Sequence, residues 1–226
     1  MITTESIKIK ALDGHTLGGY LATPDGPPRA GMLVLQEIFG VTVHIRELAN
    51  DFAAAGFLTL APALFDRLRP GTELAYADID TGRQLMQQLA IDDGARDLNA
   101  SVAVLRERLP ASAKVGAVGY CWGGAIADLA ACRTDVNAAV SYYGRANVNW
   151  LGETPRCPIL YHFGAKDPLI PPEIVQQIRA GRPGAPVFVY PDAGHGFNCT
   201  ERPEFHAPSA RLALERTLAF FARHLA

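Results

Sequence analysis

The stretch GAVGYCWGGA, residues 116–125, decides the fold of this 226-residue chain. It starts inside the short apolar run KVGAVGYC and leads into GGAIADLAAC, whose small residues favour a helix. Cys121 therefore lies at a strand-to-helix turn, between Gly119 and Gly123. In so sharp a turn, larger side chains two positions away would collide with the adjoining strand and helix. The spacing predicts a nucleophile elbow, a turn that presents one reactive side chain.

The segments on either side of the elbow alternate between buried strands and helices. An antiparallel hairpin is expected around Asp13-Gly14. Further strands are expected at 31–37, 57–65, 114–121, 136–144, 159–163 and 187–190, a loop at 66–80, and helices at 44–56, 82–109, 123–132, 172–182 and 209–225. This alternation predicts one α/β domain over residues 1–226: a mostly parallel central sheet, the N-terminal hairpin, and helices on both faces. Functional sites in such sheets lie at the carboxyl ends of the strands.

Composition narrows the possible partners. The formal net charge is -2 without any run of like charge, so neither nucleic acid nor an anionic membrane is an expected partner. The start MITTESIKIK lacks the apolar core of a signal peptide, and the four cysteines form no CxxC pair. We therefore expect a cytoplasmic protein with reduced thiols. The six histidines have no short metal-ligand spacing and the glycines do not form GxGxxG, so neither a metal nor a nucleotide cofactor is expected.

Two later residues bear on the role of Cys121. Asp167 follows the predicted strand ILYHF, and His195 follows the predicted strand VFVY. Taken singly, Asp167 fits a turn, His195 a loop, and Cys121 a small buried core residue. Together they have the order nucleophile, acid, histidine that is found in α/β-hydrolases. The start of a helix also favours the thiolate form of a cysteine. We therefore predict a Cys121-His195-Asp167 triad.

The chain resembles the dienelactone hydrolase family of α/β-hydrolases, of carboxymethylenebutenolidase type. The matching stretches are LVLQEIFGV, VGYCWGGA, HFGAKDPLIP and DAGHGF, which together span the chain from about residue 30 onward. The resemblance implies that Glu37 contacts the resting cysteine and takes its proton when substrate binds. An ordinary surface acid is the alternative, but Glu37 directly follows a buried strand. Backbone N–H groups of Ile38 and Trp122 are the expected oxyanion donors, and their side chains also fit an apolar lining.

The same resemblance bears on the substrate. Family members that open dienelactones hold the substrate carboxylate with two arginines, one of them four residues after the catalytic histidine. That position is Cys199 here, and the other falls near Ile79, with Arg83 the nearest basic residue. A thiol cannot replace a guanidinium group, so the substrate stays open. Four arginines could act by another route, although each also fits a solvated surface position: Arg67, Arg69, Arg83 and Arg202.

These patterns predict an enzyme that hydrolyses carboxylic esters or lactones through an acyl-enzyme. A broader esterase or thioesterase is one alternative, and a non-catalytic relative that binds a small molecule is another. The expected partner is a small ester or lactone, and the chain is expected to be a monomer or a small homo-oligomer. The residues expected to bind substrate are Tyr143, Phe197, Asn198, Cys199 and Arg83.

Overall fold

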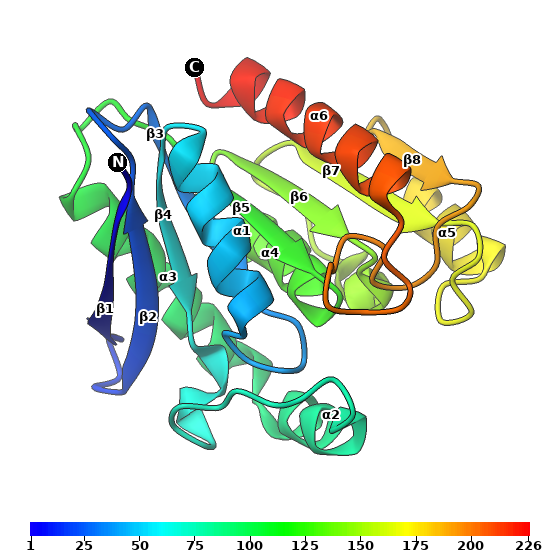
Figure 1. Cartoon of the computed structure of the whole chain (residues 1–226), viewed down its shortest axis with the longest axis horizontal. Coiled ribbons are helices and arrows are strands. Elements are labelled where there is room, and N and C mark those ends of the chain that lie inside the picture. Colours follow the sequence, from blue (N-terminus) through cyan, green and yellow to red (C-terminus); the bar gives the residue numbers. More distant parts are fainter.

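The computed structural model describes residues 1–226 and contains one eight-stranded sheet (Figure 1). The strand order is β1-β2-β4-β3-β5-β6-β7-β8, and β3 to β8 are mutually parallel. The predicted antiparallel hairpin is formed by β1 and β2. Its strand β2 also pairs with β4 in antiparallel fashion. The bounds are β1 Thr3–Lys10, β2 Thr16–Thr23, β3 Ala30–Leu35, β4 Phe57–Pro62, β5 Val115–Tyr120, β6 Ala138–Tyr142, β7 Ile159–Gly164 and β8 Val187–Tyr190.

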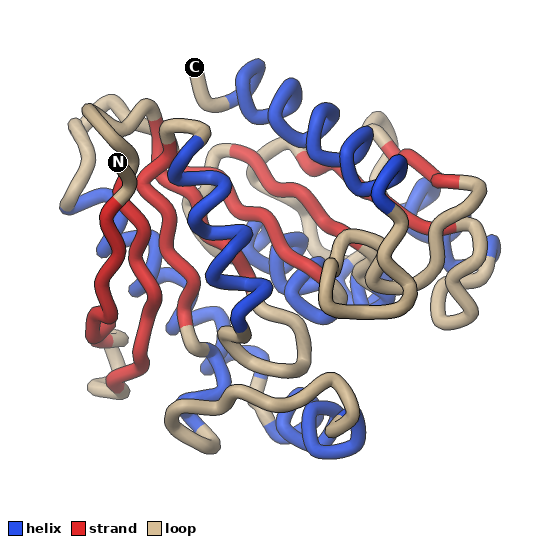
Figure 2. Tube along the Cα trace, in the orientation of Figure 1, coloured by secondary structure: helices blue, strands red, loops and turns tan.

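Helices cover both faces of the sheet (Figure 2). Helices α1 (Val43–Ala54) and α6 (Ala207–His224) lie on one face, and α3 (Ile91–Glu107), α4 (Trp122–Arg133) and α5 (Pro172–Gly181) lie on the other (Figure 1). Every residue of β3, β4, β5, β6 and β7 is buried as a result. This explains why the inner strands are mostly apolar instead of alternating between apolar and polar residues. No helix combines the length and the apolar composition needed to cross a membrane.

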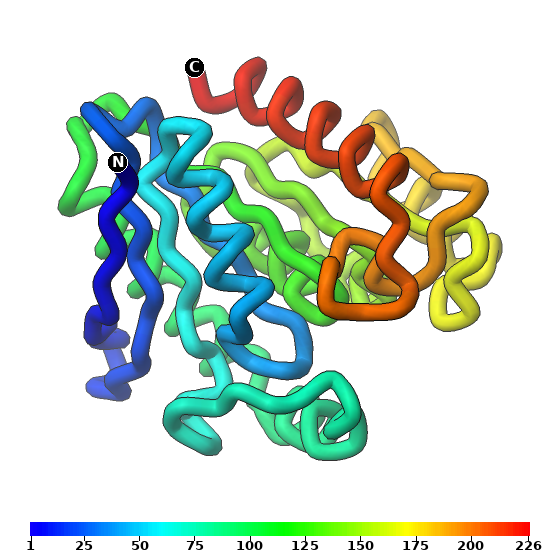
Figure 3. The backbone as a smooth tube through the Cα atoms, viewed as in Figure 1, coloured from blue at the N-terminus to red at the C-terminus, as the bar shows by residue number.

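One predicted helix is wrong. The expected helix over 82–109 is two helices, α2 (Ile79–Gln88) and α3, because Ala90 has extended backbone angles. Acidic side chains in the first turn of α3 favour a new helix start there. The break lets α2 leave the sheet, and Figure 3 shows this segment projecting away from it.

Several predicted boundaries also shift. The strand expected over 57–65 ends at Pro62, and the short helix η1 (Leu64–Arg67) follows it. The expected loop over 66–80 therefore begins within a helical turn and ends inside α2. The last helix begins at Ala207, two residues earlier than predicted, with a proline in its first turn.

Candidate active site

Cys121 occupies a strained turn between β5 and α4. Its φ is 55° and its ψ is -118°, a conformation that non-glycine residues rarely adopt. A Cβ atom on Gly119 would lie 1.8 Å from the carbonyl oxygen of Gly123. One on Gly123 would lie 2.3 Å from the carbonyl oxygen of Leu35. The glycines are thus required by close backbone approach, as the sequence predicted.

The three residues expected to form a triad are hydrogen-bonded in the expected order. His195 Nε2 lies 3.2 Å from Cys121 Sγ, and His195 Nδ1 lies 2.7 Å from Asp167 Oδ2. Asp167 follows β7 and is held in turn by the Leu169 N–H, 2.8 Å from Oδ1. Both Asp167 and His195 are buried. The order and spacing are those of a nucleophile, a base and the group that orients the base.

The surroundings of His195 raise its pKa. Burial disfavours a charged imidazole, but the negative charge of Cys121 and the hydrogen bond to Asp167 outweigh it and raise the pKa of His195 to about 10. An imidazolium beside the sulfur stabilises the thiolate, which is the nucleophilic form of cysteine.

Glu37 is enclosed beside this pair. It follows β3, is 1% exposed, and neither of its carboxylate oxygens has a hydrogen-bond partner. Burial raises its pKa to about 7, against the opposing effect of the positive charges of Arg202 and His195. The resemblance implied a contact of Glu37 with the resting cysteine, but no hydrogen bond joins them here, and Cys121 Sγ is instead 3.2 Å from His195 Nε2.

A cavity of about 450 Å³ opens in front of Cys121 and His195. Four of the residues predicted for this region line it: Ile38, Trp122, Tyr143 and Arg83. Most of the lining is apolar, and three arginines from separate elements add positive charge: Arg83, Arg145 and Arg202. No three His, Cys, Asp or Glu side chains lie close enough together to hold a metal ion.

Two N–H groups beside the cavity are candidate oxyanion donors. Trp122 is the first residue of α4, and N–H groups of the first helical turn have no partner within the helix. The Ile38 N–H donates no backbone hydrogen bond. Trp122 is fixed by stacking on Phe65, with ring centroids 4.9 Å apart. These donors come from the two segments that the sequence predicted.

Comparison with known proteins agrees with this geometry. The model of the dienelactone hydrolase family matches residues 17–225. The carboxymethylenebutenolidase of Pseudomonas putida is 37% identical over 227 residues, which cover 97% of this chain and 96% of that protein. The chain belongs to the dienelactone hydrolase family.

Solved structures place this family member among known folds. A crystal structure from Klebsiella pneumoniae, provisionally assigned as a dienelactone hydrolase, has a TM-score of 0.90 and 31% identity, covering 99% of this chain and 100% of that one. An esterase of Pyrococcus furiosus, at 16% identity, shares the fold with a TM-score of 0.73, covering 100% of this chain and 92% of its own. The fold is that of α/β-hydrolases, and the protein is a lactone or ester hydrolase.

Three residues expected to bind substrate in this hydrolase do not line the cavity. Phe197 is fully buried and packs on Tyr143, with ring centroids 5.4 Å apart. Asn198 faces a separate hollow between α1 and α6. The Cys199 thiol is buried and donates to the Tyr76 hydroxyl at 3.2 Å. Gly196, with φ +77°, turns the chain after His195 so that these side chains point away from the substrate.

Arg202 is the cavity residue that sequence reasoning undervalued. Its side chain is only 16% exposed, and its guanidinium packs over Gly196, where a Cβ atom would lie 3.1 Å from Nη1. Its Nε donates to Glu204 at 3.3 Å, whereas its terminal nitrogens have no protein partner. Its charge also acts on Glu37. Arg202 is the seventh residue after His195, and no motif spacing marks that position.

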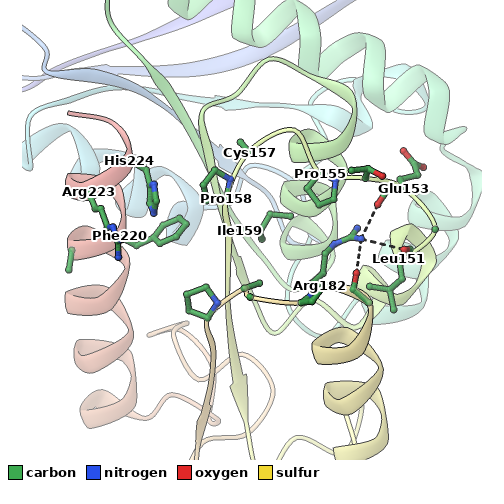
Figure 4. A pocket seen from close by; sticks show the side chains of 18 residues that line it. Leu151, Glu153, Pro155, Cys157, Pro158, Ile159, Arg182, Phe220, Arg223 and His224 are labelled. Atoms are coloured by element: carbon green, nitrogen blue, oxygen red, sulfur yellow. Dashed lines mark hydrogen bonds between the residues drawn. The ribbon is translucent and has the colours of Figure 1, made fainter.

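A larger cavity, of about 950 Å³, lies at the other edge of the sheet (Figure 4). It is bounded by the amino ends of β7 and β8 and by the end of α6. Arg182 there donates to the carbonyl groups of Leu151 and Glu153, at 3.4 and 2.9 Å, and pairs with Asp128 at 2.8 Å. The guanidinium thus ties buried segments together. Because this cavity contains no triad residue, the smaller one is the candidate active site.

Proposed function

We propose that this hydrolase cleaves its substrate through a covalent thioester on Cys121. The thiolate attacks the carbonyl carbon, and the carbon–sulfur bond forms while the carbonyl electron pair moves onto oxygen. The tetrahedral intermediate collapses, the bond to the leaving oxygen breaks, and that oxygen takes a proton from His195. Water then gives a proton to His195 and attacks the thioester, which releases the acid and restores the thiolate.

The observation that carries this proposal is the hydrogen-bonded chain from Asp167 through His195 to Cys121, with links of 2.7 and 3.2 Å. Asp167 orients the imidazole, and the positive imidazole stabilises the thiolate. The N–H groups of Ile38 and Trp122 stabilise the negative oxygen of the tetrahedral intermediate. Support for this role comes from their place beside the cavity that contains Cys121.

Glu37 acts in this scheme as a proton acceptor for Cys121 whenever the thiol is protonated. A buried carboxyl with a pKa of about 7 exchanges protons readily at neutral pH. The absence of any hydrogen-bond partner for its carboxylate oxygens supports this role, since a purely structural buried carboxylate would be paired.

We further propose that the preferred substrate is a lactone or ester that carries a carboxylate, as in the reaction for which the carboxymethylenebutenolidase relatives are named. Cys199 cannot bind that carboxylate, but Arg202 reaches the same cavity from further along the chain. Its unpaired terminal nitrogens suit a carboxylate. Arg83, on α2, also lines this cavity.

The test is steady-state kinetics on dienelactone and on aryl esters with and without a carboxylate on the acid portion. Cys121→Ala should abolish turnover, whereas Cys199→Ala should retain it. Arg202→Met should lower kcat/KM for carboxylated substrates by roughly 10- to 100-fold, the effect of one lost charge-assisted hydrogen bond, and should spare neutral esters. Arg69→Met, at an exposed arginine outside the cavity, is the matched control. Equal turnover of carboxylated and neutral esters would instead indicate a broad esterase.

We also infer that the enzyme works in the cytoplasm. All four cysteines are free thiols, and a reactive thiolate persists best where the surroundings are reducing. Fractionation of the native cells with detection by antibody would test this location.

A further inference from the structure

Helix α2 touches the segment that provides one of the proposed oxyanion donors. The helix stands apart from the sheet (Figure 1), and its residues Ile79, Arg83 and Met86 line the cavity. Gly82 lies on the same helix, and a Cβ atom there would lie 2.5 Å from the carbonyl oxygen of Ile38. It would also lie 3.1 Å from Ile38 Cγ1. Only glycine allows this approach, because a Cβ contact below 3.0 Å with backbone forces something to move.

Glycine at position 82 is unfavourable for the stability of the helix itself. Gly82 is buried in the interior of a ten-residue helix, where glycine costs about 1 kcal/mol relative to alanine. Its φ is not in the left-handed region, so no turn requires it. The close approach to Ile38 is therefore the reason for glycine at this position.

Further contacts fasten the chain before α2 to the same loop. The Leu74 N–H donates to the Phe39 carbonyl oxygen at 2.9 Å, and the Tyr76 ring meets the Phe39 ring edge-on, with centroids 4.8 Å apart. Gly40, with φ +87°, leaves room for the Thr72 carbonyl oxygen, which a Cβ atom would approach to 2.0 Å. The loop with Ile38 and the segment that leads into α2 thus form one unit.

We propose that Gly82 is a positioning residue for the oxyanion hole. Because Gly82 has no side chain, α2 can pack directly against Ile38, and this contact fixes the direction of the Ile38 N–H. The same helix lines the substrate cavity. The inference rests on the proposed role of Ile38 in the reaction. Moving a donor by about 1 Å costs much of its effect on the transition state.

The test compares Gly82→Ala with Gly94→Ala, a matched change in α3 where the new Cβ would meet only Leu89 Cδ2 at 3.8 Å. Two rates are measured for each variant: kcat on an aryl ester, and alkylation of Cys121 by iodoacetamide. Alkylation needs the thiolate but builds no negative charge on a carbonyl oxygen. Gly82→Ala should lower kcat by roughly 10- to 100-fold and leave alkylation within about twofold. Gly94→Ala should change neither rate.

Any other result would refute either the positioning role of Gly82 or the proposed nucleophile. Unchanged kcat in Gly82→Ala, or a parallel loss of both rates, would refute the positioning role. Failure of iodoacetamide to inactivate the unaltered enzyme would instead refute the proposed nucleophile. If Gly82→Ala does not fold, Tyr76→Leu takes its place, because it loosens the contact with Phe39 without removing a residue that lines the cavity. Tyr76→Leu should lower kcat by about threefold or more without slowing alkylation. An unchanged kcat in this variant would refute the inference.

Discussion

Replacing Glu37 by glutamine is expected to stabilise the folded protein, by an amount that grows with pH. Burial raises the pKa of this carboxyl from 4.5 to about 7 in the folded state. Ionisation of Glu37 therefore lowers the free energy of unfolding. One pKa unit corresponds to about 1.4 kcal/mol, so the whole shift costs about 3 kcal/mol of stability. This cost is absent below pH 4.5, rises between pH 4.5 and 7, and is complete above pH 7. Glutamine cannot ionise, so the variant does not lose this stability at any pH.

Urea unfolding at pH 5 and at pH 8 measures this gain. The Glu37→Gln variant should be more stable than the unaltered protein by about 1 kcal/mol at pH 5 and by about 3 kcal/mol at pH 8, while its esterase activity falls. Glu47→Gln, at an exposed carboxylate on α1, is the matched control and should show no such difference. A gain that is equal at both pH values, or a loss of stability at pH 8, would show that Glu37 is not an unpaired buried acid.

Three further predictions concern the triad, the elbow and the buried ion pair. Asp167→Asn should lower kcat/KM on the order of 10³-fold. It should also shift the pH dependence of Cys121 alkylation to higher pH, because the His195 imidazolium loses the negative charge that stabilises it. An unshifted alkylation profile would contradict this. Gly123→Ala should destabilise the protein by about 3 kcal/mol or more in thermal unfolding, since its Cβ would overlap backbone. Arg182→Met should cost about 3 to 5 kcal/mol in urea unfolding by leaving Asp128 buried without its cation. The folded fraction of that variant should keep its kcat, since Arg182 lies outside the active-site cavity.

The elbow and the triad could be predicted from sequence because local chemistry fixes them. Glycines two residues either side of Cys121 are needed wherever a strand meets a helix so tightly. Asp167 and His195 follow strands of one parallel sheet, so their side chains reach a common edge. The break before α3 was missed because Ala90 and its neighbours carry no glycine or proline. Helix α2 packs on Ile38 through Gly82, a contact between segments far apart in the sequence that periodicity does not reveal.

The position of Arg202 shows why spacing alone could not place this arginine at the cavity. Counting four residues from His195 presumes a particular path for the following loop. Here the Cys199 N–H donates to the Gly196 carbonyl oxygen at 2.9 Å, and the Arg202 N–H donates to the Cys199 carbonyl oxygen at 3.1 Å. These two successive turns bring the chain back, so that Arg202 lies over Gly196 and faces the cavity. The thiol of Cys199 meanwhile points inward to Tyr76. The guanidinium of Arg202, three residues after Cys199, therefore lines the same cavity as His195, although no spacing rule places it there.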